Sequence, residues 1–260
     1  MSHKPKPIST TPEVSRLQAV VIPQDYPNGH TIDWHCHAHN QLVYASSGVM
    51  AVETKLKLWV IPPLRAVWIP AYELHKVYMY GKATMKNVYL SPNIDSALPN
   101  ESEVINVSPM MREMILHLSL QPYEHSTSSH YCHVVQVLLD QLKVAPQASI
   151  QIPLPASEKL AVVCTALLKE PANNRSLKEW ARIVNVSSRT LTRLFRTDIG
   201  VTFVEYRQQI RLFHALKLLS QEQSVTTVSF ECGFSSLSAF NYLFKKNFGV
   251  TPGQFFKNAP

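Results

Sequence analysis

The chain has 260 residues, 45% of them apolar and 17% charged, which suits one large or two ordinary domains and excludes global disorder. Only 7 residues are glycine, so a collagen-like or glycine-rich chain is excluded. There is no run of 18 apolar residues, no apolar segment near the N-terminus and no C-x-x-C pair. These features predict a cytoplasmic protein with reduced cysteines and no membrane span.

Positive charge gathers in the last third of the chain. Residues 1–170 contain 13 basic and 13 acidic residues, whereas residues 171–260 contain 12 basic and 5 acidic ones, which accounts for the whole net charge of +7. A segregated basic domain indicates a polyanionic partner such as nucleic acid, although a solvated basic surface has the same composition.

The first half of the chain is predicted to be rich in strands. Residues 1–15, with several Pro, Ser and Lys, are expected to be a mobile tail, and residues 16–107 to form the first domain. Alternating or β-branched runs predict short strands at 41–45, 49–53, 57–61, 66–69, 76–80 and 86–90. Ser46, Ser47 and Gly48 are expected to form a turn between the first two. Many short, closely spaced strands predict a sandwich or small barrel.

From residue 108 the apolar period becomes helical. One helical face contains Met110, Met111, Met114, Ile115 and Leu118, another lies within residues 134–142, and a third helix is predicted over 156–169. The segment 143–155 contains three prolines and is expected to be a loop. We interpret residues 108–170 as linking helices. Their apolar excess fits packing on the barrel or a homodimer contact equally well.

Residues 171–260 are predicted to be helical and to contain two helix-turn-helix units. In the first, Ser176 and Glu179 form a capping box, and Asn185 occupies a turn position that needs a left-handed residue. Ser187 starts the second helix of this unit. The outward face of that helix contains Arg189, Thr192, Arg193 and Arg196.

The second unit repeats this pattern about fifty residues later. Ser224 starts its first helix, Gly233 forms the turn, and Ser235 or Ser236 starts the second helix. The outward face of this second helix contains Leu237, Ser238, Asn241 and Tyr242. A long helix near 202–219 is predicted to join the two units. Two recognition helices on one rigid body, about 34 Å apart, would enter successive major grooves on one face of DNA.

Residues 176–256 resemble the DNA-binding domain of the AraC/XylS family of transcription regulators. The matching strings are SSRTLTRLFRTDIGVTFVEYRQQIRLFHALKLL and ECGFSSLSAFNYLFKKNFGVTPGQFF, which correspond to both halves of that domain at the right separation. The resemblance implies two helix-turn-helix units, promoter DNA as a partner, a small-molecule effector and a contact with RNA polymerase. It leaves activation and repression both open.

The resemblance also implies roles for individual residues. Arg189, Thr192 and Arg193 occupy base-facing positions of the first recognition helix. Leu237, Ser238, Asn241 and Tyr242 occupy those of the second, where the family commonly has Arg at the position of Tyr242. We expect the second helix to lack a guanine contact, with Leu237 on a thymine methyl group and Asn241 on adenine. Phosphate contacts are expected from Arg196, Lys245 and Lys246.

A second resemblance lies in the strand-rich half. His35 and His37, followed by Pro70-Ala-Tyr-Glu-Leu-His75, resemble the two motifs of cupin barrels, H-x-H-x-x-x-E and P-x-G-x-x-H. Gln41 stands where that family has Glu, and Tyr72 where it has Gly. We expect residues 35, 37, 39 and 41 to share one face of a single strand. The candidate effector pocket is His35, His37, Gln41, Trp68 and His75.

Cupin enzymes hold a divalent metal with three His and one Glu, so the resemblance implies a metal site at His35, His37 and His75. Three imidazoles can hold Zn²⁺ or another borderline cation. The alternative is that these side chains line the effector pocket or form hydrogen bonds within the core, without a metal. His125, His130 and His133 also suggest a metal site, but no carboxylate or thiol stands at ligand spacing, and a surface role fits them better.

Three functions remain open at this point. The first is a sequence-specific transcription regulator controlled by a small molecule, with no catalytic residues. The second is a metal-dependent cupin enzyme that carries a DNA-binding domain. The third is a non-specific architectural DNA-binding protein, whose binding would depend steeply on salt and show no sequence preference.

Overall fold

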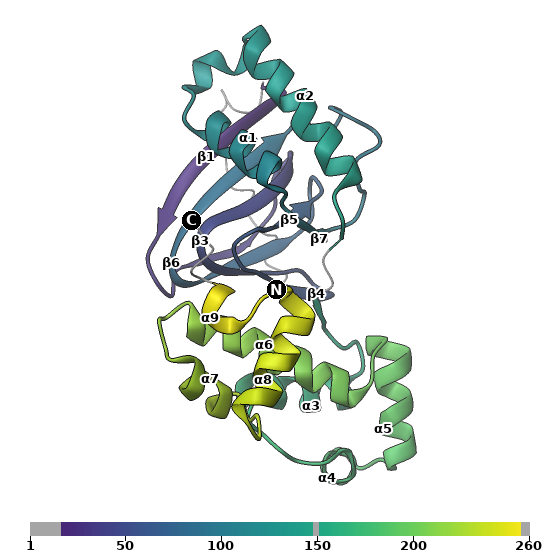
Figure 1. Ribbon diagram of the computed structural model, residues 1–260. Coiled ribbons are helices and arrows are strands. Elements are labelled where there is room, and N and C mark those ends of the chain that lie inside the picture. Colours follow the sequence, from purple (N-terminus) through teal and green to yellow (C-terminus); the bar gives the residue numbers. More distant parts are fainter. Residues whose placement is uncertain (1–16, 148–150, 256–260) are drawn as a thin grey trace. The chain divides into compact units, whose positions relative to one another are not determined.

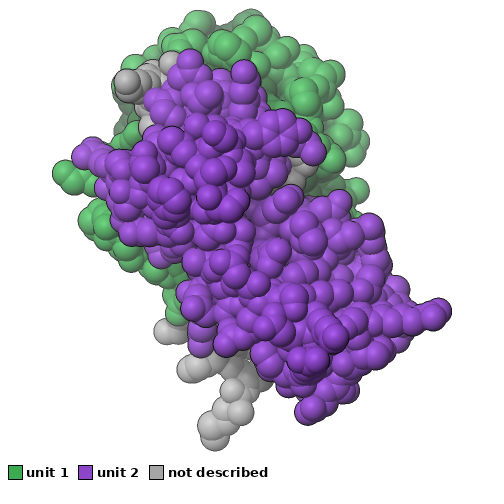
Figure 2. Space-filling model, turned by 60° about the horizontal axis from the view of Figure 1, so that its bottom comes forward, with its two compact units in different colours: residues 1–54, 59–149, 259–260 green, residues 55–58, 150–258 purple. Residues whose placement is uncertain are grey.

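The computed structural model describes residues 17–147 and 151–255, so the predicted tail at 1–15 lies outside the described residues. The described chain divides into two compact units (Figure 2). The first contains residues 17–54 and 59–147, and the second contains residues 55–58 and 151–255. No helix among these residues has the length and apolar character needed to cross a membrane.

The first unit is built on antiparallel strands (Figure 1). They are β1 (Ala19–Tyr26), β2 (Thr31–His35), β3 (Asn40–Glu53), β4 (Lys57–Ile61), β5 (Arg65–Ile69), β6 (His75–Leu90) and β7 (Glu103–Asn106). The long strand β6 pairs with β1 and β2 on one side and with β3 on the other, and β5 joins β3 to β7. The prediction of an all-β first half is confirmed.

Two of the strands are longer than the sequence predicted. The predicted strands 41–45 and 49–53 are both parts of β3, and 76–80 and 86–90 are both parts of β6. The turn predicted at Ser46, Ser47 and Gly48 is wrong, because these residues form an irregularity in the β3–β6 register. Gly48 has φ +78°, and a Cβ there would lie 2.4 Å from the Lys82 carbonyl oxygen. Glycine therefore permits a bulge inside one strand.

The two faces of the sheet have separate apolar cores. Val43, Met50, Trp59, Val67 and Met79 belong to one buried cluster that the strands form among themselves. Neighbouring residues of the same strands, such as Leu42 and Trp68, point to the opposite face because side chains alternate along a strand. The second cluster lies between that face and two helices.

These helices are α1 (Pro109–Ser119) and α2 (Ser129–Val144), joined by the short 3₁₀ helix η2 (Tyr123–Thr127). Ser108 and Ser128 accept hydrogen bonds from the first turns of α1 and α2. Met111, Ile115 and Leu118 are buried against the sheet, as the sequence predicted, and each contributes about 1.5–3 kcal/mol. Placing Met110 on this buried face was wrong, because it lies on the solvent side of α1 and is 53% exposed. Figure 1 shows both helices lying across the strands.

The second unit is almost entirely helical. Its elements are β8 (Gln151–Pro153), α3 (Glu158–Lys169), α4 (Leu177–Ile183), α5 (Ser188–Leu194), the π-helical turn η3 (Phe195–Ile199), α6 (Phe203–Leu219), α7 (Val225–Glu231), α8 (Leu237–Phe248) and α9 (Pro252–Phe255). The strand β8 replaces part of the loop predicted at 143–155, and the N–H group of Leu154 donates to the Leu56 carbonyl at 2.8 Å. Because α3 groups with this unit, the predicted linking segment 108–170 is divided between the two units.

Candidate nucleic-acid interface and histidine cluster

The first helix-turn-helix consists of α4 and α5. The Ser176 N–H donates to the Glu179 carboxylate at 2.7 Å, and the Glu179 N–H donates to the Ser176 hydroxyl at 3.3 Å, so the predicted capping box is present. Asn185 follows α4 with φ +52°, which confirms the predicted left-handed turn. Ser187 then caps α5 by accepting a bond from the Thr190 N–H at 3.0 Å.

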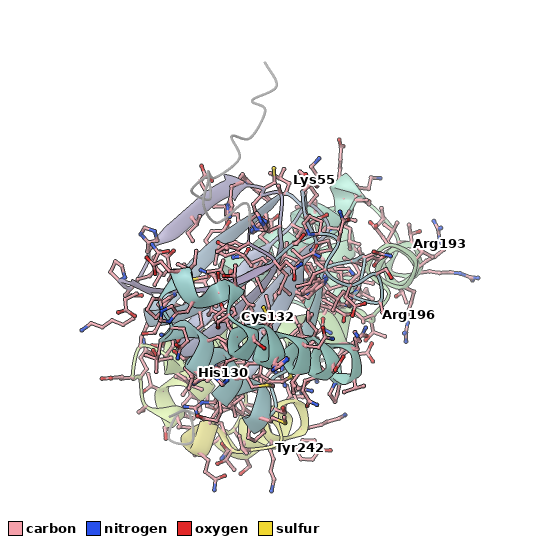
Figure 3. The ribbon with its side chains drawn as sticks, turned by 90° about the horizontal axis from the view of Figure 1, so that it is seen from above. Lys55, His130, Cys132, Arg193, Arg196 and Tyr242 are labelled. Carbon is pink, nitrogen blue, oxygen red and sulfur yellow. The ribbon has the colours of Figure 1, made fainter. Side chains whose placement is uncertain are left out.

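The polar face of α5 is open to solvent. Leu191 and Phe195 are completely buried on one side, which fixes the rotation of the helix. Arg189, Thr192 and Arg193 are exposed on the opposite side, and Arg196 is exposed on the next turn, in η3. Figure 3 shows Arg193 and Arg196 extending outward. The sequence prediction of an arginine-bearing outer face is therefore reproduced in the structure.

The second helix-turn-helix consists of α7 and α8. Ser224 caps α7, Gly233 forms the turn with φ +77°, and Ser236 caps α8 by accepting from the Ala239 N–H at 3.2 Å. Phe240 and Phe244 are completely buried and anchor α8. The outer face carries Ser238, Lys245 and Lys246, all exposed, and Tyr242, which is 72% exposed (Figure 3), with Leu237 and Asn241 half-buried.

The helix α6 joins the two helix-turn-helix units, as predicted. Thr202 and Glu205 form a second capping box at its start, and Phe203, Tyr206, Ile210 and Leu216 are buried along one side. The ring of Phe195, which follows the first helix-turn-helix, lies 5.7 Å from the ring of Tyr206. Aromatic packing of this kind ties the first recognition helix to α6.

Two basic residues of this unit have an internal role that the sequence did not suggest. The Arg211 guanidinium donates to the Pro171 carbonyl at 3.2 Å and to the Asn174 side chain at 2.7 Å. Arg207 donates to the Arg175 carbonyl at 3.3 Å. These arginines hold the segment before α4 while keeping their charge, so part of the basic character of the domain serves its own fold.

In the first unit, three predicted histidines converge. The candidate ligand atoms of His35, His37 and His75 all lie within 4.8 Å of one another, and all three residues are buried. His35 ends β2, and His75 begins β6 directly opposite it, so strand pairing brings them together. His37 lies between β2 and β3, and Gln41 lies on β3. The expectation that residues 35–41 form one strand is therefore wrong, because β2 ends at His35.

The hydrogen bonds of two of the three rings define their tautomer. Each Nδ1 contacts a backbone carbonyl, from His35 to Asp33 at 2.8 Å, from His37 to His39 at 2.7 Å and from His75 to Glu73 at 2.8 Å. A carbonyl oxygen only accepts, so in His35 and His75 Nδ1 carries the proton and Nε2 keeps its lone pair. This is the tautomer in which a histidine binds a metal through Nε2.

Burial keeps the rings neutral. It lowers the pKa of His35 and His37 and lowers the pKa of His75 to about 3. Nε2 of His75 has no hydrogen-bond partner among the described residues although it is buried. An orphaned buried nitrogen beside two others is the condition that a bound cation would relieve, so these residues fit a divalent metal.

Gln41 contacts this cluster in an unexpected way. Its Oε1 lies 2.7 Å from Nε2 of His37, and its Nε2 donates to Asn87 at 2.9 Å and to the Tyr89 hydroxyl at 3.3 Å. Burial raises the pKa of Tyr89 to about 12, so this hydroxyl is neutral. An amide oxygen only accepts, so this contact requires a proton on Nε2 of His37, and a metal would have to displace both that proton and Gln41.

Trp68 does not join the predicted pocket. It belongs to the cluster beneath α1 and α2, and its indole N–H donates to the Pro99 carbonyl at 2.8 Å. Ile69 pairs with Gln41, and Trp68 pairs with Leu42, so alternation turns Trp68 to the other face. Placing it with the histidines was therefore wrong.

Tyr72 keeps the backbone conformation of the glycine that the cupin motif has at this position. It has φ +65°, the left-handed conformation that glycine adopts without cost, and its N–H donates to the His37 carbonyl at 2.8 Å. The position needs this backbone angle to hold the turn before His75 against the His37 segment.

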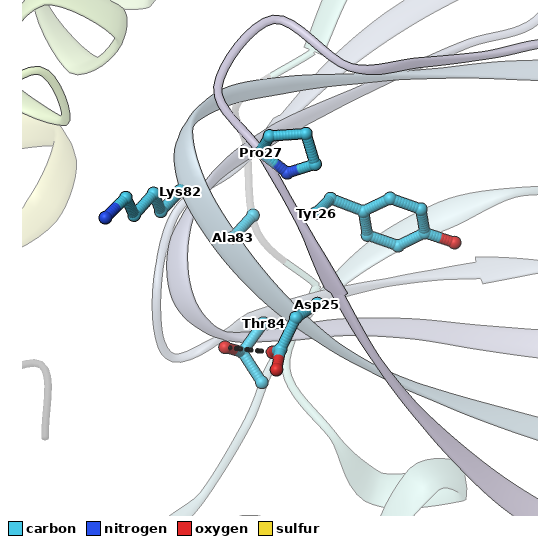
Figure 4. Close-up of a pocket in the computed structure, with 6 residues that line it drawn as sticks. All are labelled: Asp25, Tyr26, Pro27, Lys82, Ala83 and Thr84. Carbon is cyan, nitrogen blue, oxygen red and sulfur yellow. Dashed lines mark hydrogen bonds between the residues drawn. The ribbon is translucent and has the colours of Figure 1, made fainter.

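A separate hollow of about 460 Å³ opens elsewhere on the first unit (Figure 4). The Thr84 hydroxyl donates to Asp25 at 2.7 Å within it. Sequence reasoning did not find this hollow, since no motif marks it. Its lining residues are Asp25, Tyr26, Pro27, Lys82, Ala83 and Thr84.

Two helix-turn-helix units with exposed polar recognition helices, joined by one long helix, define a DNA-binding protein. Residues 180–258 match the family model described as a helix-turn-helix domain. The transcriptional regulator NimR of Escherichia coli strain K12 is 30% identical over 221 residues, which cover 85% of this chain and 81% of NimR. The chain belongs to the AraC/XylS family of transcription regulators.

Other similarities cover less of the chain or are more distant. The transcriptional regulator RipA of Corynebacterium glutamicum is 38% identical over 103 residues, 40% of this chain and 31% of RipA. The structure of ToxT from Vibrio cholerae with an unsaturated fatty acid bound is 12% identical, with a TM-score of 0.38, and the match covers 92% of this chain and 94% of ToxT. The protein is thus a DNA-binding transcription regulator, and the relatives named here are regulators rather than enzymes.

Proposed function

We propose that α5 and α8 bind two successive major-groove segments of one promoter, and that a ligand at the histidine cluster regulates this binding. The observation that carries the first part is the repeated construction of the two units, in which a buried apolar face turns the polar face of each recognition helix to solvent. Family membership makes DNA the partner, and the exposed side chains suggest what each helix recognises.

The exposed side chains of α5 favour guanine. Arg189 and Arg193 are four residues apart, so they lie on one face of the helix. An arginine can donate to O6 and N7 of guanine at once, which is worth about 1–3 kcal/mol of discrimination. Thr192 lies between them, but its hydroxyl donates to the Ser188 carbonyl at 2.9 Å. Its methyl group is therefore the part available to a base.

The helix α8 favours A·T pairs. None of its base-facing residues can form the two-donor contact with guanine. Asn241 can pair with adenine, and Leu237 and the exposed ring of Tyr242 offer apolar surface for thymine methyl groups. Arg196, Lys245 and Lys246 are exposed beside the recognition faces and suit phosphate contacts. The promoter site would thus have a G-containing half and an A·T-rich half.

For the sensing unit, we propose that His35, His37 and His75 hold a divalent cation, with Zn²⁺ as the first candidate. The neutral rings, the Nε2 lone pairs of His35 and His75 and the orphaned nitrogen of the latter support this. His37 would join them on release of its Nε2 proton and of Gln41. A bound ion would supply a Lewis-acid centre for an anionic effector. Gln41, Asn87 and Tyr89 add polar groups next to it. Binding there would shift the balance between DNA-binding and non-binding arrangements.

Assembly forms a further part of the proposal. Leu120 and Val144 are 81% and 72% exposed at the ends of α1 and α2, and Met110 is 53% exposed on α1. Exposed apolar side chains on these helices favour a homodimer, which light scattering would measure. We also propose that the protein contacts RNA polymerase and is located in the cytoplasm, because promoter DNA is its proposed partner.

The DNA part is tested by selecting binding sites from random duplexes with the full chain. Wild type should enrich one bipartite site. Arg189→Ala should lose the preference at one or two base pairs, a change of about 10-fold or more, while Lys246→Ala should weaken all sequences alike. Equal loss across all sequences for both variants would contradict base recognition by α5.

The metal part is tested by the effect of Zn²⁺ on thermal unfolding. Zn²⁺ should raise the melting temperature of wild type, because an ion that binds only the folded state stabilises it. His75→Ala should clearly reduce the shift. His39→Ala is the matched control, since His39 is buried nearby but outside the cluster, and should retain it. An equal shift in all three proteins would contradict the site.

A further inference from the structure

Two histidines on the surface of the first unit face each other across the two helices. His117 lies in the last turn of α1, and His130 is the second residue of α2. Their Nε2 atoms are 3.3 Å apart, and their ring planes are inclined by 84°. Both side chains are exposed. The sequence singled out His130 together with His125 and His133, but the structure pairs His130 with a residue of the other helix.

The spacing of the two nitrogens matches a metal site. In a tetrahedral zinc site with Zn–N bonds of about 2.0–2.1 Å, two ligand nitrogens lie roughly 3.4 Å apart. The observed 3.3 Å agrees with this value. It also agrees with a single hydrogen bond between two neutral rings, so the experiment must separate these two interpretations.

The backbone holds the pair in place. Leu118 and Tyr131 each follow one of the histidines and are 1% and 3% exposed in the core cluster beneath the helices. Ser128 caps the start of α2 by accepting from the Tyr131 N–H at 3.2 Å. Both rings therefore project from fixed backbone positions, and an ion would need little rearrangement to bind.

We propose that His117 and His130 form a second metal site, which binds Zn²⁺ or another borderline divalent cation at the surface. Imidazole suits Zn²⁺, Cu²⁺ and Ni²⁺, whereas Mg²⁺ and Ca²⁺ prefer oxygen. Among the described residues, the only group of three or more candidate ligands is the buried cluster, so the pair acts alone. Two positions of a tetrahedral ion stay open to water, and binding is weaker than at a three-histidine site.

The site does not depend on the buried cluster, and the experiment keeps them apart. The full chain carrying His75→Ala is titrated with Zn²⁺ by calorimetry, so that the buried cluster is disabled. It should bind one ion per chain. Adding His117→Ala or His130→Ala should weaken binding at least 10-fold. Adding His133→Ala, an exposed residue one turn further along α2, should leave it unchanged.

Two results would overturn the proposal. One is a His75→Ala chain that is folded by circular dichroism but binds no Zn²⁺. The other is equal affinity after His117→Ala. If His75→Ala does not fold, wild type and His117→Ala are titrated instead, and the number of bound ions should fall by one. An unchanged number would contradict the site. A wild-type chain that binds one Zn²⁺ at His117 and His130 but none at the buried cluster would contradict the proposal for the buried cluster and support the surface site.

Discussion

At Tyr72, the backbone φ angle matches the cupin-like motif although the residue type does not. The cupin-like pattern has glycine at this position, and Tyr72 keeps the left-handed φ of +65° while its side chain is 70% exposed. A non-glycine residue pays about 1–2 kcal/mol for that conformation. Strain retained beside the histidine cluster suggests that the geometry of this turn matters for the cluster.

This predicts the effect of two substitutions. Tyr72→Gly should be more stable than Tyr72→Ala by about 1 kcal/mol, because both lose the same side chain but only glycine relieves the strain. Urea unfolding of the two variants measures the difference. If alanine is as stable as glycine here, the turn is not strained.

The histidines themselves show what sequence can and cannot reveal at this scale. The residue types and the motif spacing were enough to select His35, His37 and His75. Side-chain alternation along one strand predicted that Gln41 would lie beside His35 and His37. Because β2 ends at His35 and β3 starts at Asn40, that alternation does not explain the position of Gln41. The contact between Gln41 and His37 depends on Asn87 and Tyr89, more than forty residues away, and no local pattern indicates it.

At the scale of elements, capping residues decided which predictions were right. Each recognition helix starts at a serine whose hydroxyl accepts a hydrogen bond from the backbone N–H three residues later. This pattern is local in the sequence. Ser187 was predicted as the start of α5, and Ser235 or Ser236 as the start of α8, where the structure uses Ser236. The strands depend on partners far along the chain. β1, β2 and β7 were not predicted, although β1 begins with an apolar run, and pairing with β6 or β5 is what forms them.

The two turns after α5 and α7 offer a matched test. Gly200 and Gly233 have φ of +86° and +77°, but a Cβ at Gly200 meets nothing within 4 Å, whereas at Gly233 it would lie 2.7 Å from Ala172 Cα. Gly200→Ala should cost about 1–2 kcal/mol from conformation alone. Gly233→Ala should cost clearly more, because the backbone of the segment before α4 must also move. Thermal unfolding compares them, and equal losses would show that this contact is loose.

At the scale of the whole molecule, function is divided between two compact units. The sequence places the entire net charge in the helical unit, which gives general attraction to DNA. In the proposed function, discrimination between sequences rests on a few neutral or arginine side chains of α5 and α8. Since Arg207 and Arg211 are used inside the unit, charge alone does not measure affinity. The sequence predicted this division well, because helix-turn-helix units are local, but it could not identify the effector.

The central claim is specific recognition of promoter DNA under control of the first unit. The most direct measurement incubates the full chain with sheared DNA from its source genome at near-physiological salt, with and without Zn²⁺, and sequences the retained fragments. We predict a few sharp peaks upstream of genes that share one bipartite motif, with half-sites about 10 base pairs apart. Peak heights should change when Zn²⁺ is added. Retention spread evenly over the genome under both conditions would contradict the account.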